Sequence, residues 1–182
     1  MLLAAVMLAV PADANAQDEW DRAAAAVVRL EPARFPELPA AVRAELERLG
    51  CRIPQAFYPE EPHNVIRGSF ARAGQEDWAV LCSRGGASEI LVFWGGPARC
   101  PSPIGEPQAD RDWLQGIGGD EIGYSRHIRA VGREFILRMH EAFGGPEPPP
   151  IEHQGIEEHF VEKASSVLYC YQGKWLVLTG MD

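Results

Sequence analysis

The sequence lacks the features that would assign it to several common functional classes. It has no run of basic residues and a formal net charge of −9, which argues against nucleic acid and anionic membranes as partners. No apolar run approaches the ~20 residues that a membrane-spanning helix needs. C-x-x-C, G-x-S-x-G and a phosphate-binding glycine loop between a strand and a helix are also missing, so no cofactor is expected.

The first residues form a short apolar run, MLLAAVMLAV, which Pro11 ends. The small residues of Ala14-Asn15-Ala16 then match the pattern that signal peptidases cleave. We therefore expect a signal peptide over residues 1–16, cleaved after Ala16, and a periplasmic or extracellular location. Because no cysteine follows this site, a lipoprotein is not expected. The alternative interpretation is a buried N-terminal helix.

The chain contains four cysteines, Cys51, Cys82, Cys100 and Cys170. An even number in an exported chain allows two disulfides, with three possible pairings. We favour Cys51 with Cys82 and Cys100 with Cys170, because Cys51 lies just ahead of the predicted hairpin that carries Cys82. Buried free thiols are the alternative.

Two helices are expected in an N-terminal helical segment, residues 17–50. Residues 17–31 are rich in alanine and begin with acidic side chains, which stabilise a helix N-terminus, and two prolines follow. Over residues 37–50, Val42, Leu46 and Leu49 recur at helical spacing, and Gly50 is a suitable C-terminal cap.

After Gly50 the pattern changes to short apolar strands between glycines and prolines, which predicts a β domain over residues 51–182. We expect one hairpin turning at residues 84–87, a second around residues 131–133, and a third at residues 172–174. No helical stretch of ~12 residues separates these strands, as parallel crossovers would require. The predicted fold class is α+β, mostly antiparallel β, with N-terminal helices followed by three β-hairpins in one twisted sheet.

One segment, GSFARAGQEDWAV at residues 68–80, resembles a single repeat of the FG-GAP and VCBS family, which forms β-propeller blades in secreted and surface proteins. The resemblance rests on Gly68, Phe70, Gly74, Asp77 and Val80. It implies a strand, a tight loop and a second strand. At the positions of the family's calcium ligands this chain has one carboxylate, Asp77, together with a serine and two alanines. Because calcium needs 6–8 oxygen ligands, the resemblance implies the shape of this loop without the metal.

A full propeller would need more blades than this chain has room for, since each takes ~40–45 residues. The whole chain also resembles small exported bacterial proteins of unassigned function, and that resemblance implies no activity.

The densest set of possible metal ligands lies in IEHQGIEEHF, residues 151–160. His153, Glu157 and His159, with a water molecule, would suit a catalytic zinc site. The alternative is a solvated acidic turn, because the spacing is not H-E-x-x-H and Gly155 interrupts a helix. For nucleophilic catalysis, Ser69 and the segment Ser125 to His127 are weak candidates.

Among the tryptophans, Trp78 and Trp94 lie in apolar runs and are expected in the core, whereas Trp113 is the loop aromatic expected at the surface. Exposed aromatics of this kind could hold an unknown exported protein or a glycan. Because no complete catalytic set is present, the leading hypothesis is a non-catalytic binding or interaction module. The alternative is an exported metal-dependent hydrolase.

Overall fold

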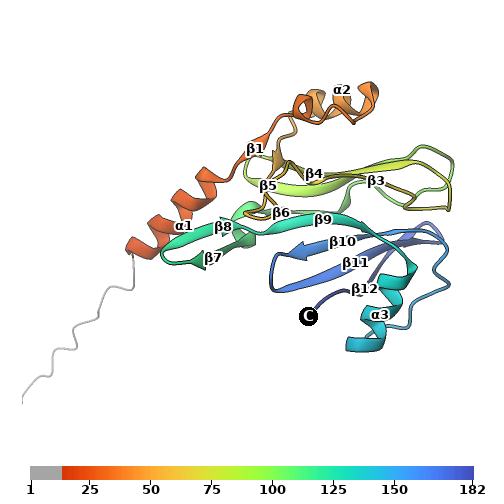
Figure 1. The fold of residues 1–182 in the computed structure, drawn as a ribbon. Coiled ribbons are helices and arrows are strands. Elements are labelled where there is room, and N and C mark those ends of the chain that lie inside the picture. Colours follow the sequence, from red (N-terminus) through yellow and green to blue (C-terminus); the bar gives the residue numbers. More distant parts are fainter. Residues whose placement is uncertain (1–13) are drawn as a thin grey trace, which may run out of the picture.

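A computed structural model describes residues 14–182. The fold is α+β and predominantly β, with two four-stranded sheets in its centre (Figure 1). Helix α2 covers the outer side of the first sheet and helix α3 covers the outer side of the second, while helix α1 lies beside a two-stranded hairpin (Figure 1). The order of layers is therefore helix, sheet, sheet and helix.

The first sheet has the strand order β3-β4-β5-β6, and the second has the order β12-β11-β10-β9. Every strand pairing is antiparallel, as expected. The strands of these two sheets are β3 Val65–Gly68, β4 Asp77–Arg84, β5 Ala87–Phe93, β6 Ile104–Ala109, β9 Arg126–Val131, β10 Gly155–Phe160, β11 Ala164–Tyr171 and β12 Lys174–Thr179.

Two smaller pairs complete the β structure. Strands β1 (Arg29–Leu30) and β2 (Ile53–Pro54) connect the N-terminal segment to the domain. Strands β7 (Leu114–Gly118) and β8 (Glu121–Tyr124) form a hairpin beside α1. Short 3-10 turns, η1 at Pro32–Arg34 and η2 at Asp110–Trp113, follow β1 and precede β7.

The N-terminal helices form close to where they are expected. Helix α1 spans Ala14–Ala26 and ends before β1, so the helix predicted over residues 17–31 stops about one turn early. Helix α2 spans Ala40–Arg48 and buries Leu46, and Gly50 after it has a positive φ of 67°. The signal peptide expected over residues 1–16 falls mainly outside the described residues, and Ala14–Ala16 form the first residues of α1.

The predicted second hairpin is wrong. Residues up to Val131 form strand β9, but Arg133–Phe143 form helix α3, with Gly132 as its N-cap. Ile136 and Met139, three residues apart, are buried on one face of α3, whereas Leu137 is exposed. An alternating strand would not produce this burial pattern, and the segment consists mainly of good helix formers.

The strands also do not lie in one twisted sheet, because they form separate sheets. Strand β4 is buried on both faces. Trp78, Val80 and Cys82 contact the layer of α2, whereas Ala79 and Leu81 face the core between the two sheets. The apolar run of β4 therefore reflects burial on two sides, which a single half-exposed sheet would not provide. The hairpins at residues 84–87 and 172–174 form as predicted.

Both disulfides have the predicted pairing. Cys51 bonds to Cys82 and ties the end of the N-terminal segment to β4, and Cys100 bonds to Cys170 and ties the loop after β5 to β11. In the part of the chain that the structure describes, no helix has the length and apolar content needed to cross a membrane.

Candidate binding site

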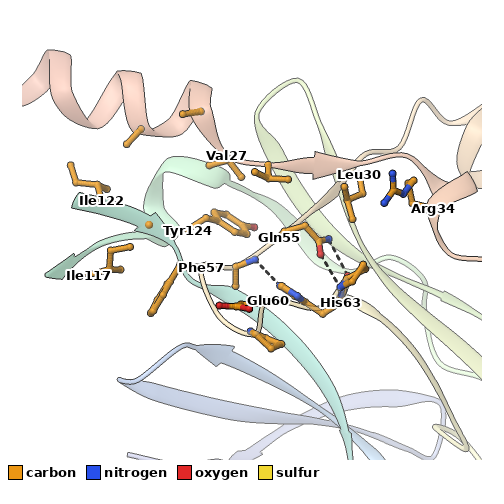
Figure 2. A pocket seen from close by; sticks show the side chains of 17 residues that line it. Val27, Leu30, Arg34, Gln55, Phe57, Glu60, His63, Ile117, Ile122 and Tyr124 are labelled. Atoms are coloured by element: carbon orange, nitrogen blue, oxygen red, sulfur yellow. Dashed lines mark hydrogen bonds between the residues drawn. The ribbon is translucent and has the colours of Figure 1, made fainter. Parts of the chain in front are cut away.

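The segment from Gln55 to His63 forms a closed turn that precedes β3. The side-chain amide of Gln55 pairs with both backbone groups of His63, donating to its carbonyl at 3.1 Å and accepting its N–H at 2.9 Å. The imidazole of His63 in turn accepts the N–H of Ala56 at Nε2, 2.7 Å away, and its Nδ1 lies 2.7 Å from the carbonyl of Glu61. These contacts hold the two ends of the turn together (Figure 2).

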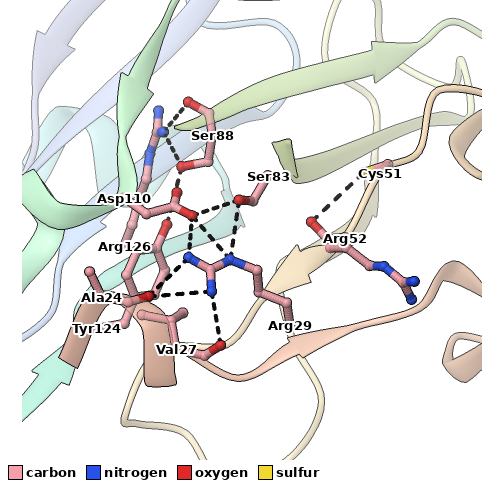
Figure 3. A network of polar contacts seen from close by, with 10 residues as sticks. All are labelled: Ala24, Val27, Arg29, Cys51, Arg52, Ser83, Ser88, Asp110, Tyr124 and Arg126. Carbon is pink, nitrogen blue, oxygen red and sulfur yellow. Dashed lines mark hydrogen bonds and ion pairs between the residues drawn. The ribbon is translucent and has the colours of Figure 1, made fainter. Parts of the chain in front are cut away.

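Arg29 fixes the position of helix α1 above the hairpin. Its guanidinium donates to the carbonyls of Ala24 and Val27 at the C-terminal end of α1, where backbone acceptors have no helical partner. It also pairs with Asp110 at 2.7 Å, and Asp110 is 1% exposed and accepts a further hydrogen bond from Ser83 (Figure 3). The buried ion pair therefore anchors α1 to the first sheet.

The β7–β8 hairpin faces α1 through Tyr124 and its neighbours. Tyr124 is buried, its hydroxyl lies 3.2 Å from Ser88 Oγ, and its carbonyl accepts the N–H of Phe57 at 2.7 Å. Burial, followed by the charge of Asp110, raises the pKa of Tyr124 well above its ordinary value. Gly123 has no room for a Cβ, which would lie 2.9 Å from both Phe57 and Ile117.

Between α1, the hairpin and the 55–63 turn lies a cleft of about 510 Å³, which we call the α1 cleft. Most of its lining side chains are apolar, and the two charged side chains in the lining, Arg34 and Glu60, form no ion pair among the described residues (Figure 2). Val28, in the lining, is 60% exposed. The lining consists of Ala23, Ala26, Val27, Val28, Leu30, Arg34, Gln55, Ala56, Phe57, Pro59, Glu60, Pro62, His63, Ile117, Ile122, Gly123 and Tyr124.

His63 also belongs to a row of three histidines, His63, His127 and His159, in edge-on contact behind the cleft, which we call the histidine cluster. Its ring contacts His127 of β9 edge-on at a centroid distance of 5.1 Å, and His127 contacts His159 of β10 at 5.6 Å. Burial lowers the pKa of His63 below 6.5. Burial, and then the charges of His63 and His159, lower the pKa of His127 to about 4.

Of the three predicted metal ligands, the structure brings Glu157 and His159 together and gives His153 other partners. His159 Nε2 lies 2.8 Å from Glu157, whose carboxylate also pairs with Arg129 and accepts from Ser165. His153 instead stacks on Tyr169, and its ring nitrogens lie 2.8 and 2.9 Å from backbone carbonyls. Within residues 14–182 no group of three or more histidine, cysteine or acidic side chains is arranged to hold a metal ion.

The carboxylate of Glu157 is fully buried. Burial alone would raise its pKa, but the contacts with His159, Arg129 and Ser165 outweigh this effect and the pKa is lowered. Because these contacts use both carboxylate oxygens, Glu157 joins β9, β10 and β11 rather than facing an open site.

The loop that resembles a calcium-binding repeat is organised around Asp77. Both carboxylate oxygens of this buried residue accept hydrogen bonds, from the N–H of Phe70 at 2.9 Å, the N–H of Gly95 at 3.0 Å and the amide of Gln75 at 2.8 Å. Gly74 has the positive φ, 77°, that the tight loop requires. Asp77 therefore caps this loop by accepting backbone N–H groups.

The other candidate residues are structural. Ser125 is fully buried, and Ser69 binds Gln154 through its backbone. Trp78 lies in the core as expected, and Trp94 is half-buried against Trp175. Trp113 is also half-buried, stacked on Phe160 and covered by Arg126, rather than exposed as predicted.

Sequence reasoning missed the α1 cleft entirely. Its walls come from four separate segments, and each wall residue taken alone is an ordinary apolar or loop residue. The only local signals were the proline-rich stretch before β3, with Pro59 and Pro62, and the glycines of β7 and β8.

Comparison with models of known protein families, with curated proteins and with solved structures finds no match to this chain.

Proposed function

We propose that this protein is an exported, non-catalytic binding protein that holds a small, mainly apolar molecule in the α1 cleft. The observation that carries the proposal is the size and lining of this cleft. Its volume of about 510 Å³ falls within the ~300–1,000 Å³ of typical small-molecule sites, which are mostly apolar with a few polar groups. A protein partner would need ~800 Å² of surface on each side.

The chemistry of the lining supports an apolar ligand over a glycan. The described tryptophans do not line the cleft, and its aromatic rings belong to Phe57 and Tyr124, of which Tyr124 is already buried. Sugar recognition uses exposed aromatic faces together with many polar groups. Arg34 lines the cleft and forms no ion pair among the described residues, which suits a ligand with an anionic group at one end.

Export is supported by two observations. Two disulfides are typical of proteins that fold in oxidising compartments. In addition, cleavage after Ala16 would leave the part of α1 that packs on the core, including Trp20, Ala23 and Ala24. We also propose that the 68–80 segment is a degenerate FG-GAP-like repeat, a hypothesis that the shape of the Asp77 loop supports.

The test uses two fluorescent probes, the anion 1-anilinonaphthalene-8-sulfonate and the uncharged N-phenyl-1-naphthylamine. We expect both to bind the mature protein with about one site per chain. Ala26→Trp fills the cleft from α1 and should weaken both probes about tenfold or more, whereas Ala44→Trp, at an exposed position of α2, should change neither.

Arg34→Gln separates the contribution of charge. It should weaken the anionic probe and leave the uncharged probe unchanged, because it removes a cation and little apolar surface. Equal binding of both probes to the Ala26→Trp and Ala44→Trp variants would refute the cleft as the site. Binding of a soluble glycan or an exported protein that Ala26→Trp leaves intact would favour those partners instead.

A further inference from the structure

We propose that protonation of His63 opens the 55–63 wall of the α1 cleft, so that the protein releases its ligand at acidic pH. The ligand release rests on the proposed function, whereas the opening of the wall does not. The hydrogen bonds of the His63 ring and the two histidines in edge-on contact behind it support this proposal.

The contacts of His63 require a neutral ring with one defined tautomer. The Ala56 N–H can only donate, so Nε2 must accept it, at 2.7 Å. The Glu61 carbonyl can only accept, so Nδ1 must carry the proton that points to it, also at 2.7 Å. A neutral imidazole has one donor and one acceptor and satisfies both contacts. An imidazolium has two donors, so its Nε2–H would oppose the Ala56 N–H and this bond would be lost.

The bond from Ala56 closes the wall of the cleft. Gln55 and Ala56 lie at the start of the turn and His63 at its end, and all three line the cleft (Figure 2). Phe57, the next residue, donates to the Tyr124 carbonyl and contacts the floor at Gly123. Loss of the Ala56 bond would therefore loosen the turn between its two attachments, where Tyr58 is already 63% exposed.

Titratable and charged side chains approach His63 from β9, from β10 and from the turn itself. On β9, His127 touches the ring edge-on and Arg129 lies on the same strand. On β10, His159 contacts His127 edge-on. The carboxylate of Glu157 is already paired with His159 and Arg129. On the turn itself the side chains of Glu60 and Glu61 are solvent-exposed.

Burial lowers the pKa of His63 despite the Glu61 contact, so the neutral ring is favoured at neutral pH and protonation requires acidic pH. Burial, followed by the charges of His63 and His159, lowers the pKa of His127 to about 4.

The opening of the 55–63 wall can be measured in the absence of ligand. In the mature protein, long-range ¹H–¹⁵N spectra of the histidine rings would follow the His63 tautomer from about pH 7.5 to about pH 4.5. Amide exchange over the same range would give the Ala56 protection factor. We expect an Nδ1–H tautomer at neutral pH. We also expect Ala56 protection to fall about tenfold as His63 becomes protonated, the change typical of one hydrogen bond. Protection that stays constant while His63 titrates would overturn the inference.

Two variants sharpen the test. His63→Gln can present an oxygen to Ala56 and cannot titrate, so Ala56 protection should become independent of pH. His140→Gln replaces a histidine of α3 outside the histidine cluster and should keep the wild-type response. If His63→Gln does not fold, the titration of the unmodified protein still decides the question.

Ligand release is measured with the uncharged probe, because this probe does not titrate between about pH 7.5 and about pH 4.5. Its affinity should fall about tenfold together with Ala56 protection. An affinity that stays constant while the wall opens would overturn the proposed release. Loss of Ala56 protection in a protein that binds no probe at any pH would support the opening of the wall and refute the proposed function alone.

Discussion

The side chain of Asn64 pairs with the backbone around Ile128 as a neighbouring strand would. Asn64 Oδ1 accepts the Ile128 N–H at 2.9 Å, and Nδ2 donates to the Arg126 carbonyl at 3.1 Å and to the Pro54 carbonyl at 2.7 Å. Asn64 is fully buried immediately before β3, and β3 lies next to β9. One amide therefore joins the edges of the two four-stranded sheets.

Replacement of Asn64 should be among the most destabilising single changes outside the apolar core. Asn64→Ala removes three buried hydrogen bonds and places an alanine at a φ of 69°, so we expect a loss of about 2–4 kcal/mol in the free energy of unfolding. Asn64→Gly tolerates this φ and isolates the hydrogen-bond contribution. Urea unfolding of both variants would measure the two effects, and a loss below about 1 kcal/mol for both would show that Asn64 does not join the sheets.

Calcium should have no effect on the loop around Asp77. Both oxygens of its carboxylate already accept hydrogen bonds from N–H donors, so a cation would have to displace them. The melting temperature should be the same in millimolar calcium and in chelator. A rise on adding calcium, lost in Asp77→Asn, would identify a metal site here and contradict the prediction.

The same carboxylate should contribute strongly to stability. Asp77→Asn keeps the shape of the side chain but offers a single acceptor oxygen, and we expect a loss of about 1–3 kcal/mol. Glu76→Gln, a change at an exposed neighbour, is the matched control and should be close to neutral. Chemical unfolding of the pair gives the difference, and similar values for both would argue against the role of Asp77.

The two disulfides should stabilise the fold to different extents. Cys100 and Cys170 are 70 residues apart in the sequence and Cys51 and Cys82 are 31 apart. Loop-closure entropy then predicts contributions of about 4.4 and about 3.7 kcal/mol, respectively. Paired Cys→Ser variants, compared by urea unfolding, should show the larger loss for Cys100 and Cys170. The reverse order would indicate that local packing outweighs chain entropy.

The free energy of unfolding should decrease on acidification, because a residue of the histidine cluster becomes protonated. The pKa of His127 is about 4 in the folded protein and about 6.5 in an unfolded chain, so the unfolded state binds more protons between these values. Stability is therefore complete above about pH 6.5, falls as the pH drops towards 4, and changes no further from this group below 4.

For a half-buried ring, we expect a loss of roughly 1–2 kcal/mol from His127 after allowing for solvent screening. His127→Phe keeps an aromatic ring that does not titrate and should flatten the dependence over this range, which unfolding at several pH values would measure. His140→Gln serves as the control. An equally steep dependence in His127→Phe would assign the effect to other groups. Below pH 4.5 the lowered pKa of Glu157 should add a further loss.

Much of the fold was determined by local patterns in the sequence. Leu46 and its helical neighbours specify α2, the glycines at residues 85 and 86 specify the turn between β4 and β5, and the 68–80 motif specifies the tight loop around Asp77. These features depend on residues close together in the chain, so local propensity and turn geometry suffice to predict them. The pairing of Cys51 with Cys82 was favoured from the order of the elements, which left Cys100 to pair with Cys170.

Only the tertiary structure decided the rest. The segment after Gly132 has apolar residues compatible with a strand or a helix, and packing of Ile136 against the second sheet selects the helix. The two sheets meet at their edges through Asn64, a single polar residue in a loop. The α1 cleft and the histidine cluster combine segments up to about a hundred residues apart in the sequence. Contacts between such segments arise from packing of the whole chain rather than from the pattern of any one segment.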